Sequence, residues 1–340
     1  MNFWLRFVFT SMFLAWPAAA QSLDIYLLDM SAATLIVTPQ RESILIDTGH
    51  KKYEERDAEL IRKALTEQAG LKQIDHLVVS HFHIDHYGAI LRLSQMLPVL
   101  NFYDHGLLTE LKEDPKEFET LYPEYLTASQ GRRKTLRPGD EIPLKQGKSP
   151  LQLRCVGSNR ETLPHGEKKK PECENPDLRI DDFTENGKSV VLLLRFGQFE
   201  FLHTGDLTWN EESRLVCPTN LIGAVDVFQT SSHGNRTSNS PLLLRSITPT
   251  VTLVNNAPGK GGHPEVISRL TKLPDFRDAF QLHLNLSPGN ESAISQDLIA
   301  NLGPRENCPG NWIHLSVRPD GKEFAVTNSR NGLRRKYPVR

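Results

Sequence analysis

Residues 81–86 read His-Phe-His-Ile-Asp-His, and this short stretch carries the strongest signal in the chain. With 12 His among 340 residues, an H-x-H-x-D-H pattern arises by chance in roughly one chain in a thousand of this composition. It follows an apolar run at residues 74–80 that is typical of a buried strand. Residues two apart on the extended exit of a strand face the same way, so His81 and His83 can converge on one ion.

The second part of the motif predicts a second ion. Asp85 and His86 fall where a helix is expected to begin, which turns their side chains toward another metal position nearby. Imidazole and carboxylate ligands together suit zinc, and manganese or iron are the alternatives. A cluster of ordinary core or surface histidines is the competing interpretation, and the low chance frequency argues against it.

The overall charge limits the classes of partner. The chain has 40 Lys and Arg against 41 Asp and Glu, a formal net charge of −1. Binding to nucleic acid through counterion release needs a basic surface, so the charge does not indicate a nucleic-acid partner, and one would have to be held locally. We expect an ordinary globular protein.

The pattern around the motif repeats in two similar halves. The first half alternates expected strands with a helix, at residues 23–28, 33–37, 43–49, 56–68 and 74–80. In the second half, residues 189–196 and 198–204 are expected to form a hairpin. A helix is expected to begin near residue 210, and a strand is expected at residues 225–230. Both halves contain an apolar strand that stops at an acidic Thr/Gly turn. Two sheets with helices outside fit this pattern better than one doubly wound sheet.

The remaining segments complete the expected domain. Residues 110–187 are richer in charge, Pro and Gly, which is typical of an insertion. The last part of the chain alternates apolar and polar residues on both sides of Asp320-Gly321, which predicts a terminal β-hairpin. We expect residues 21–340 to form one domain with this insertion and hairpin tail.

Residues 1–20 have the composition of a secretory signal peptide. One cation, Arg6, precedes an apolar run at residues 7–16, and Ala18 and Ala20 fit a cleavage site. The apolar run is shorter than the roughly 18–20 residues that span a bilayer, and no later segment is long and apolar enough, so no stable membrane span is expected after cleavage. The protein is therefore expected to be exported, and to be periplasmic or secreted.

Export permits disulfides, which can join the four cysteines in three ways that the sequence does not rank. The cysteines are Cys155, Cys173, Cys217 and Cys308. A zinc site built from cysteines is disfavoured, because no two of them have a C-x-x-C spacing.

At the 81–86 motif the chain resembles the metallo-β-lactamase superfamily, whose hallmark is H-x-H-x-D-H after the first βα segment. The resemblance covers nearly all of the chain after residue 20. It is closest to the branch that includes the hydrolase domain of the DNA-uptake protein ComEC. Besides the motif, the stretches that carry it are residues 45–49, 202–207, 232–240, 260–264 and 326–332. The resemblance implies an αββα four-layer sandwich of two mixed sheets with helices outside.

The resemblance also implies a ligand set. His81 and His83 would hold the first metal, and Asp206 would bridge to the second. The second metal would be held by Asp85, His86 and His233. A hydroxide shared by the two zinc ions would then attack the substrate, with Asp85 also orienting that hydroxide.

Several residues are expected to assist the ligands. Asp47 is expected to fix a ligand imidazole rather than to bind metal. Members of the superfamily often have one more His in the first metal's shell, and the candidates here are His105, His165 and His203. Successive side chains of a strand point to opposite faces, so His203 is expected to face away from Asp206. We therefore expect it to pack or to support a ligand rather than to bind metal. His263 is expected either to supply the missing group or to contact substrate.

The resemblance implies an exported metal-dependent hydrolase that uses a metal-bound hydroxide on a small-molecule or phosphoester substrate, and its ComEC-like details favour a phosphoester or phosphodiester. A lactone or β-lactam hydrolase of the same fold is the alternative within this class. A non-catalytic exported metal-binding protein is the alternative outside it, because the first metal's shell lacks an evident third ligand. Arg236 and Lys260 lie close in sequence to the expected ligands and could receive an anionic group, and a solvent-facing role is the equal alternative for them. The other histidines, at positions 50, 76, 283 and 314, lack metal spacing and are expected to be structural.

Overall fold

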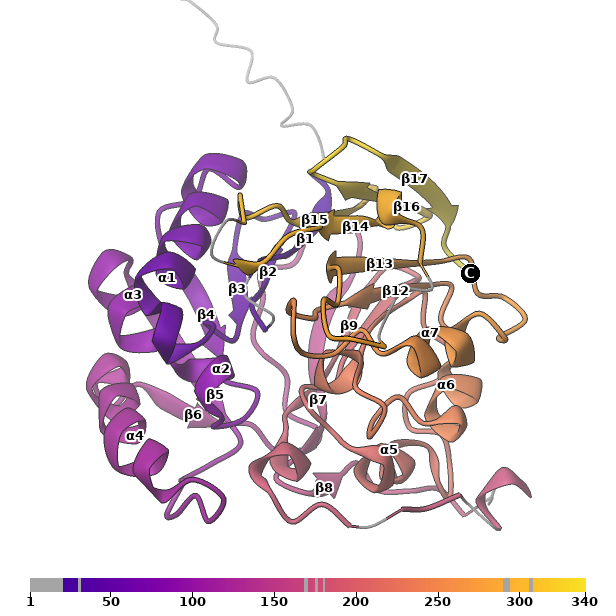
Figure 1. Cartoon of the computed structure of the whole chain (residues 1–340), viewed down its shortest axis with the longest axis horizontal. Coiled ribbons are helices and arrows are strands. Elements are labelled where there is room, and N and C mark those ends of the chain that lie inside the picture. The colour runs from indigo at the N-terminus through magenta and orange to yellow at the C-terminus, as the bar shows by residue number, and fades with distance from the viewer. Residues whose placement is uncertain are drawn as a thin grey trace, which may run out of the picture.

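The computed structural model describes residues 21–29, 32–167, 171–174, 177–179, 181–289, 294–305 and 308–340. Two mixed β-sheets lie face to face with helices on both outer sides (Figure 1). The α/β fold with two mixed sheets that the sequence predicts is therefore confirmed. The expected signal peptide at residues 1–20 lies outside the described residues.

The first sheet contains nine strands in the order β17-β16-β15-β1-β2-β3-β4-β5-β6. Strands from β17 to β3 pair antiparallel, and β3 to β6 pair parallel. In chain order the strands are β1 (Leu23–Leu27), β2 (Thr34–Val37), β3 (Ser43–Ile46), β4 (Ile74–Val78), β5 (Val99–Asp104), β6 (Arg133–Thr135), β15 (Ile313–Val317), β16 (Glu323–Asn328) and β17 (Arg334–Pro338). The hairpin expected around Asp320-Gly321 is present as β15 and β16, and β17 extends the sheet beyond it.

The second sheet contains eight strands in the order β14-β13-β12-β11-β10-β9-β7-β8. Its strands β10 to β14 pair parallel, and β7 to β10 include the antiparallel hairpin around Gly197. The strands are β7 (Leu151–Ser158), β8 (Glu161–Thr162), β9 (Val191–Phe196), β10 (Phe199–His203), β11 (Val227–Gln229), β12 (Val251–Val254), β13 (Asp278–His283) and β14 (Ile299–Asn301).

Helices cover the outer face of each sheet (Figure 1). Those beside the first sheet are α1 (Glu54–Lys63), α2 (Ile84–Tyr87), α3 (Ile90–Met96) and α4 (Pro115–Ser129). Those beside the second sheet are α5 (Trp209–Val216), α6 (Pro241–Ile247) and α7 (Pro264–Leu270). Helix α1 continues as a π-helical turn at Ala64–Gln68.

Three hydrophobic cores separate four layers. One core packs the sheets against each other and includes Ile46 and Phe201. A second lies between the first sheet and its helices, with Leu77 and Ile61 among its members. A third lies between the second sheet and α5 to α7. Burial of apolar area at roughly 25 cal/mol per Å² makes these layers the main source of stability.

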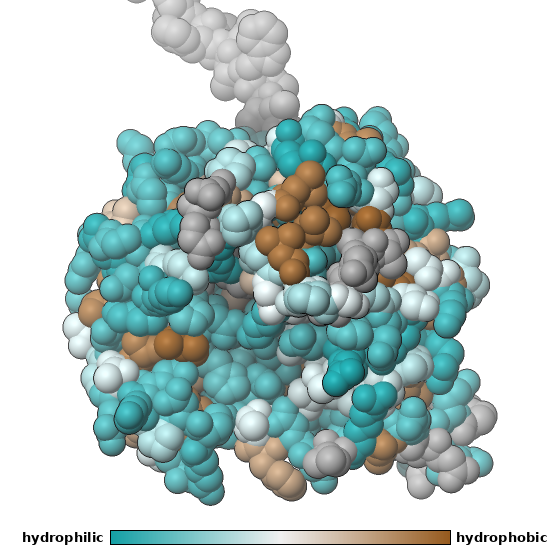
Figure 2. Space-filling view, in the orientation of Figure 1, coloured by the Kyte–Doolittle hydropathy of each residue, from teal (hydrophilic) through white to brown (hydrophobic). Residues whose placement is uncertain are grey.

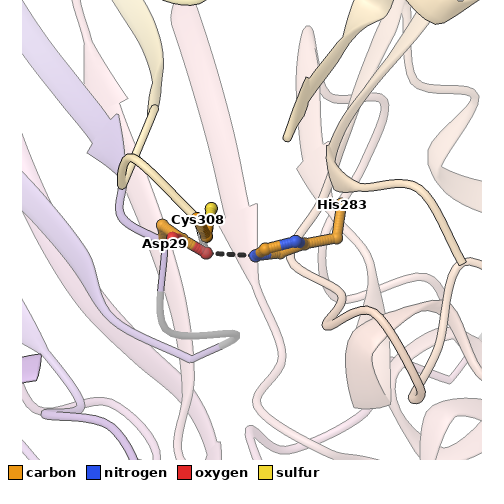
Figure 3. Close-up of side chains that lie close together, drawn as sticks. All are labelled: Asp29, His283 and Cys308. Carbon is orange, nitrogen blue, oxygen red and sulfur yellow. Dashed lines mark hydrogen bonds and ion pairs between the residues drawn. The ribbon is translucent and has the colours of Figure 1, made fainter. Parts of the chain in front are cut away.

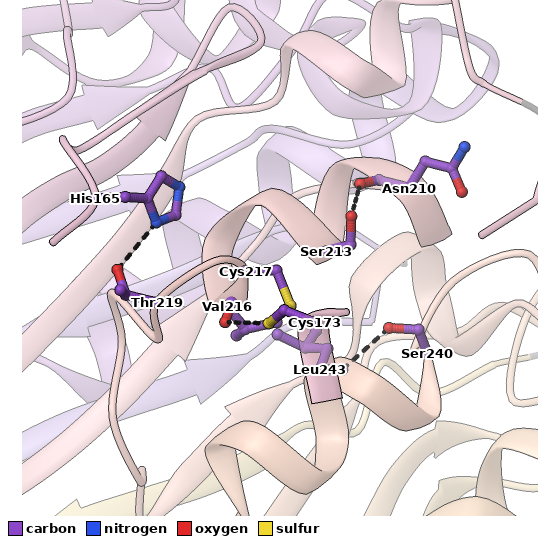
Figure 4. Close-up of a disulfide and its surroundings, with 9 residues drawn as sticks. All are labelled: His165, Cys173, Asn210, Ser213, Val216, Cys217, Thr219, Ser240 and Leu243. Atoms are coloured by element: carbon purple, nitrogen blue, oxygen red, sulfur yellow. Dashed lines mark hydrogen bonds between the residues drawn. A yellow bond between two sulfur atoms is a disulfide. The ribbon is translucent and has the colours of Figure 1, made fainter. Parts of the chain in front are cut away.

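The inserted region is joined covalently to the second layer of helices. A disulfide links Cys173, in the short helix Pro171–Cys173, to Cys217 at the end of α5 (Figure 4). Cys155 and Cys308 carry free thiols. The sequence left open which cysteines pair. Among the described cysteines, Cys173–Cys217 is the only disulfide. None of the described helices has both the length and the apolar character that a membrane crossing requires.

Candidate metal centre

The candidate ligands lie where strands of the two sheets end beside each other. His81 and His83 follow β4, and Asp206 and His233 follow β10 and β11 in the other sheet. The backbone N–H of Val190, just before β9, donates to the carbonyl oxygen of Ser80 at 2.8 Å and joins the sheets here. The centre therefore forms at a seam between the two halves of the chain.

Tight turns aim the ligands of the second half. Gly205 has φ +55°, and a Cβ atom there would lie 2.7 Å from Cβ of Ser189. This position therefore suits glycine, and the turn places Asp206 with its N–H donating to the hydroxyl of Ser189 at 3.1 Å. The N–H of Ser232 donates to the carbonyl oxygen of Gly205 at 3.1 Å, which couples this turn to the one that carries His233.

Strained backbone marks the site. Asp47, Ser232 and His233 have φ values of 63°, 46° and 58°. Conformations of this kind cost of order 1–3 kcal/mol in non-glycine residues and concentrate at functional sites.

His81 and His83 present one nitrogen each to a common point. Nε2 of His81 lies 3.1 Å from Nδ1 of His83. Two nitrogens bound tetrahedrally to one zinc ion, each at about 2.0–2.1 Å, lie about 3.3 Å apart. The separation therefore suits a shared ion as well as a hydrogen bond.

The other four expected ligands gather beside this pair. Nε2 of His233 lies 3.3 Å from Oδ2 of Asp85 and 3.2 Å from Oδ2 of Asp206. Nε2 of His86 lies 3.8 Å from Oδ2 of Asp85 and 3.5 Å from Oδ1 of Asp206. His81 joins this group through His86 and Asp206, with all three ligand atoms within 4.8 Å of one another. The structure thus brings together all six residues that the resemblance assigned to metal.

The second ring nitrogen of each imidazole is engaged by a neighbouring group. For His86 it is the Asp47 carboxylate at 2.8 Å, and for His83 the Glu113 carboxylate at 3.1 Å. The hydroxyl of Ser80 lies 3.1 Å from Nδ1 of His81, and the carbonyl oxygen of Asn255 lies 3.1 Å from Nδ1 of His233. Such partners fix the tautomer and orientation of imidazoles that bind metals. Asp47 has the assisting position expected for it.

Two buried polar atoms at the centre lack hydrogen bonds. They are Nε2 of His86 and Oδ1 of Asp206. Leaving a buried polar atom without a partner costs about 1–3 kcal/mol, and an ion between the two atoms would satisfy both. The donor set of imidazoles and carboxylates, together with these atoms, fits zinc and also iron or manganese.

The charges at the centre also favour a cation. Burial and the neighbouring His86 hold the pKa of His81 well below its usual range, so this ring is neutral and able to bind metal. Burial opposes charge on His86, yet the Asp206 and Asp85 carboxylates raise its pKa well above the usual value. Without a metal, a proton on His86 therefore balances the charge of the Asp206 and Asp85 carboxylates. A bound metal ion would balance the same charge.

A cavity of 340 Å³ opens beside Asp85. Its lining includes His50, Tyr53, Lys260 and Arg305. The ammonium group of Lys260 lies 2.7 Å from Oδ2 of Asp85. The cavity therefore combines a candidate metal ligand with two cationic side chains, which suits an anionic group.

The remaining expected residues lie outside the ligand cluster. Nδ1 of His263 accepts the N–H of Glu265 at 3.2 Å and caps helix α7. It belongs to neither candidate metal group at the centre, and its role in catalysis stays a prediction. The residue that contacts Asp85 from the loop before α7 is Lys260, not His263.

The three candidates for an additional histidine ligand have other contacts. His105 pairs with the buried carboxylate of Glu185 and packs against Phe82. Nδ1 of His165 lies 3.1 Å from the hydroxyl of Thr219, near the disulfide (Figure 4). Nδ1 of His203 accepts the N–H of Gly205 at 3.2 Å, and burial lowers the pKa of this ring to about 4. None of the three belongs to a candidate metal group among the described residues.

A second cluster of metal-capable side chains lies between the sheets. Asp29 and His283 contact each other directly, and Cys308 lies beside them (Figure 3). Asp29 also pairs with the guanidinium group of Arg56, and the Cys308 thiol donates to Oδ1 of Asn301 at 3.0 Å. Because Arg56 already balances the carboxylate, we read this cluster as a buried ion pair. This agrees with the structural role expected for His283.

Glu113 is the contact that sequence reasoning missed. It lies 30 positions beyond His83 in the inserted region, and its carboxylate also accepts the N–H of Glu185 at 2.6 Å. A glutamate in a charge-rich segment carries no signal that distinguishes it from its neighbours.

A family model of known proteins matches residues 27–166, which include the 81–86 motif. The model is that of the metallo-beta-lactamase superfamily, and the match covers less than half of the chain. The two mixed sheets described above are consistent with the fold of that superfamily. The match agrees with the superfamily that the motif suggested and leaves the branch within it as a prediction.

Several solved structures resemble this chain at 14% identity. A mutant of CmlA, a diiron beta-hydroxylase from Streptomyces venezuelae, aligns over 79% of this chain and 53% of its own, with a TM-score of 0.46. A putative metal-dependent hydrolase from Parabacteroides distasonis aligns over 76% and 92%, with a TM-score of 0.41. A diphosphatase of the PhnP family aligns over 66% and 72%, with a TM-score of 0.34. The chain spans about half the length of the CmlA chains, and no curated protein matches it.

Proposed function

We propose that this chain is a metal-dependent hydrolase of an anionic ester, a phosphoester or phosphodiester. The observation that carries the proposal is the cationic cavity beside the cluster. Lys260 approaches Asp85 to 2.7 Å on its wall, and Arg305 lines the same cavity. Cationic side chains beside the reacting centre favour a substrate with a phosphoryl charge over a neutral lactone.

The residues of the chain divide the work as follows. His81, His83, Asp85, His86, Asp206 and His233 would hold two ions, for which zinc is proposed and manganese or iron are alternatives. When bound, the ions lower the pKa of a water molecule to about 7 and neutralise charge on the ester. Asp85 would orient the attacking water from its position between His233 and Lys260. Lys260 would bind a phosphoryl oxygen, because a charge-assisted hydrogen bond to an anion is stronger than a neutral one.

The test compares three substrates on the purified, metal-loaded protein. We expect turnover of bis(p-nitrophenyl) phosphate, and little or none of nitrocefin or a simple lactone. Asp206→Ala and Asp85→Ala should reduce this turnover to the uncatalysed rate, while Asp320→Ala, at an exposed position, should leave it unchanged. Preferred turnover of nitrocefin or the lactone, or activity near wild type in both ligand variants, would overturn the proposal.

Metal content separates the hydrolase from a non-catalytic binding protein. A specific contact keeps this alternative open, because the Lys260 ammonium lies where it can balance Asp85 without a metal. Elemental analysis after zinc reconstitution should give two ions per chain, and fewer in the Asp206→Ala variant. One ion per chain with no turnover of any ester would favour the binding protein.

We also propose that the protein is exported, to the periplasm or beyond. Residues 1–20 have the composition of a signal peptide. The Cys173–Cys217 disulfide is consistent with an oxidising compartment. Mass spectrometry of protein recovered from a cell envelope or culture fraction should give a chain that begins near Gln21. Recovery of the full-length chain from the cytosol alone would contradict export.

A further inference from the structure

A larger cavity, of 820 Å³, shares no lining residue with the cavity beside Lys260. The inserted region and the start of α5 form it, and its lining includes Lys112, Glu113, Phe183, Thr208 and Trp209. A volume of this size is in the range of small-molecule sites. The function proposed above assigns it no role.

The cavity adjoins the centre. The Glu113 carboxylate on its wall lies 3.1 Å from Nε2 of His83, so a wall residue contacts a candidate metal ligand. Thr208, which also lines the cavity, follows Asp206 by two positions. A group held here lies next to the centre and can belong to a molecule that reacts there.

Of the two aromatic rings that line the cavity, one is covered by arginine side chains and the other is exposed. Guanidinium groups of Arg179 and Arg269 lie 3.9 and 4.8 Å from the ring centre of Trp209, which is buried. Phe183 is 83% exposed, with Arg160 at 6.0 Å from its ring. Most of the face in Figure 2 is hydrophilic, and Phe183 is the most exposed large apolar side chain among the described residues.

The charges of the two cavities differ. Lys260 and Arg305 line the smaller one beside Asp85. In the larger one Lys112 and Glu113 offset each other, and its lining contains acidic as well as basic side chains. The phosphoryl group is therefore better matched to the smaller cavity, which leaves the larger one for the organic part of the ester.

We propose that the cavity around Phe183 is a subsite that binds a planar aromatic group of the substrate, a phenyl ring or a nucleobase. This rests on the function proposed above. The group stacks on the Phe183 ring and is bounded by the Trp209 wall. Every base and aryl ring has a π-face, so stacking recognises the class rather than one member.

The test measures binding of phosphonates, which contain no hydrolysable phosphoester bond. Titration calorimetry with the metal-loaded protein compares methylphosphonate, phenylphosphonate and the 5′-methylenephosphonate analogue of thymidine 5′-phosphate, in which a C–P bond replaces the ester linkage. We expect the two aromatic ligands to bind roughly 5- to 150-fold tighter than methylphosphonate, the range that ring stacking supplies. Tighter binding of the thymidine ligand than of the phenyl ligand would identify a nucleobase.

Variants locate the effect. Phe183→Ala should bring the three affinities together and leave that of methylphosphonate unchanged, whereas Phe183→Tyr should keep the aromatic preference. Leu100→Ala, at a similarly apolar exposed side chain on β5, serves as the control and should match wild type.

The outcomes separate the two proposals. Equal binding of all three ligands to wild type, or an aromatic preference that survives Phe183→Ala, overturns the subsite while ester turnover still supports the hydrolase. If none of the three ligands binds and no phosphoester is turned over, the proposed function fails and the subsite fails with it.

Discussion

Oδ2 of Asp47 lies 2.8 Å from Nδ1 of His86, at the point where β3 ends beside β4. The same carboxylate accepts the backbone N–H and the hydroxyl of Ser80, each at 2.7 Å. One buried side chain thus fixes both a ligand ring and the strand exit that carries the 81–86 motif. The precision of the centre depends on this carboxylate although it does not face the metal positions.

Replacing this carboxylate should weaken metal binding. Asp47→Asn keeps the shape but loses the charge that orients His86, and removal of such a partner typically costs 10–100-fold in metal affinity or activity. Competition with a chromogenic chelator measures the change. Asp24→Asn is the matched control, because Asp24 forms a similar contact with His314 at 2.9 Å away from the centre. Equal affinities in wild type and Asp47→Asn would show that Asp47 does not orient a ligand.

Removing the Lys260 charge should weaken substrate binding. A hydrogen bond to a charged group is worth about 1.5–3 kcal/mol, which corresponds to a rise in KM of roughly 10- to 150-fold for a phosphodiester in Lys260→Ala. Lys260→Arg should recover part of the loss. Lys272→Ala, at an exposed lysine, is the control in the same steady-state assay. A KM that does not change in Lys260→Ala would remove this residue from the substrate site.

The buried pair of Asp29 predicts a pH-dependent contribution to stability. Burial opposes its charge, but His283 and Arg56 outweigh this and lower the pKa of Asp29. Its stabilising contribution is therefore present above about pH 4, the usual pKa of an aspartate, and is lost as the pH falls through the lowered value. Asp29→Asn should destabilise the protein by about 3–5 kcal/mol at pH 7, because it leaves buried partners without their countercharge.

Urea unfolding at pH 7 and in the acid range checks this prediction. The difference between wild type and Asp29→Asn should shrink as the wild-type carboxyl becomes protonated. Asp275→Asn is the control, since Asp275 forms an exposed pair with Arg340 at 3.8 Å and should contribute less than about 1 kcal/mol. A difference that is constant with pH would contradict the assignment.

The disulfide should stabilise the inserted region. Loss of a native disulfide typically costs about 2–5 kcal/mol, so the Cys173→Ser/Cys217→Ser double variant should unfold at lower urea. Reductant should lower the stability of wild type by a similar amount and leave the double variant unaffected. Sensitivity of the double variant to reductant would point to a different pair of thiols.

The site residues that the sequence predicted lie in short motifs or directly after apolar strands that end in a turn. His81, His83, Asp85 and His86 share one short motif, and apolar strands that end in acidic or Gly-containing turns precede Asp47 and Asp206. Strand alternation, turn glycines and ligand spacing are properties of neighbouring residues, and a single sequence displays them directly. The two-sheet arrangement followed from the order of such strands and helices.

The features that the sequence did not predict depend on contacts between distant segments. Glu113 and Phe183 gain their positions only when the inserted region folds against α5 and the centre. Strand β17 contains Arg334, Arg335 and Lys336, and its pairing with β16 leaves only Tyr337 of the strand buried. Three consecutive cations are typical of a solvated tail, so the pattern gave no indication of a strand.

The seam between the sheets gives the metal a further role. The first sheet supplies the 81–86 motif, and the second supplies Asp206 and His233. An ion bound there joins the two halves of the chain and stabilises the folded state by about 4 kcal/mol when its free concentration is a thousand times its Kd. Metal supply would then control how long the protein resists proteolysis as well as whether it is active.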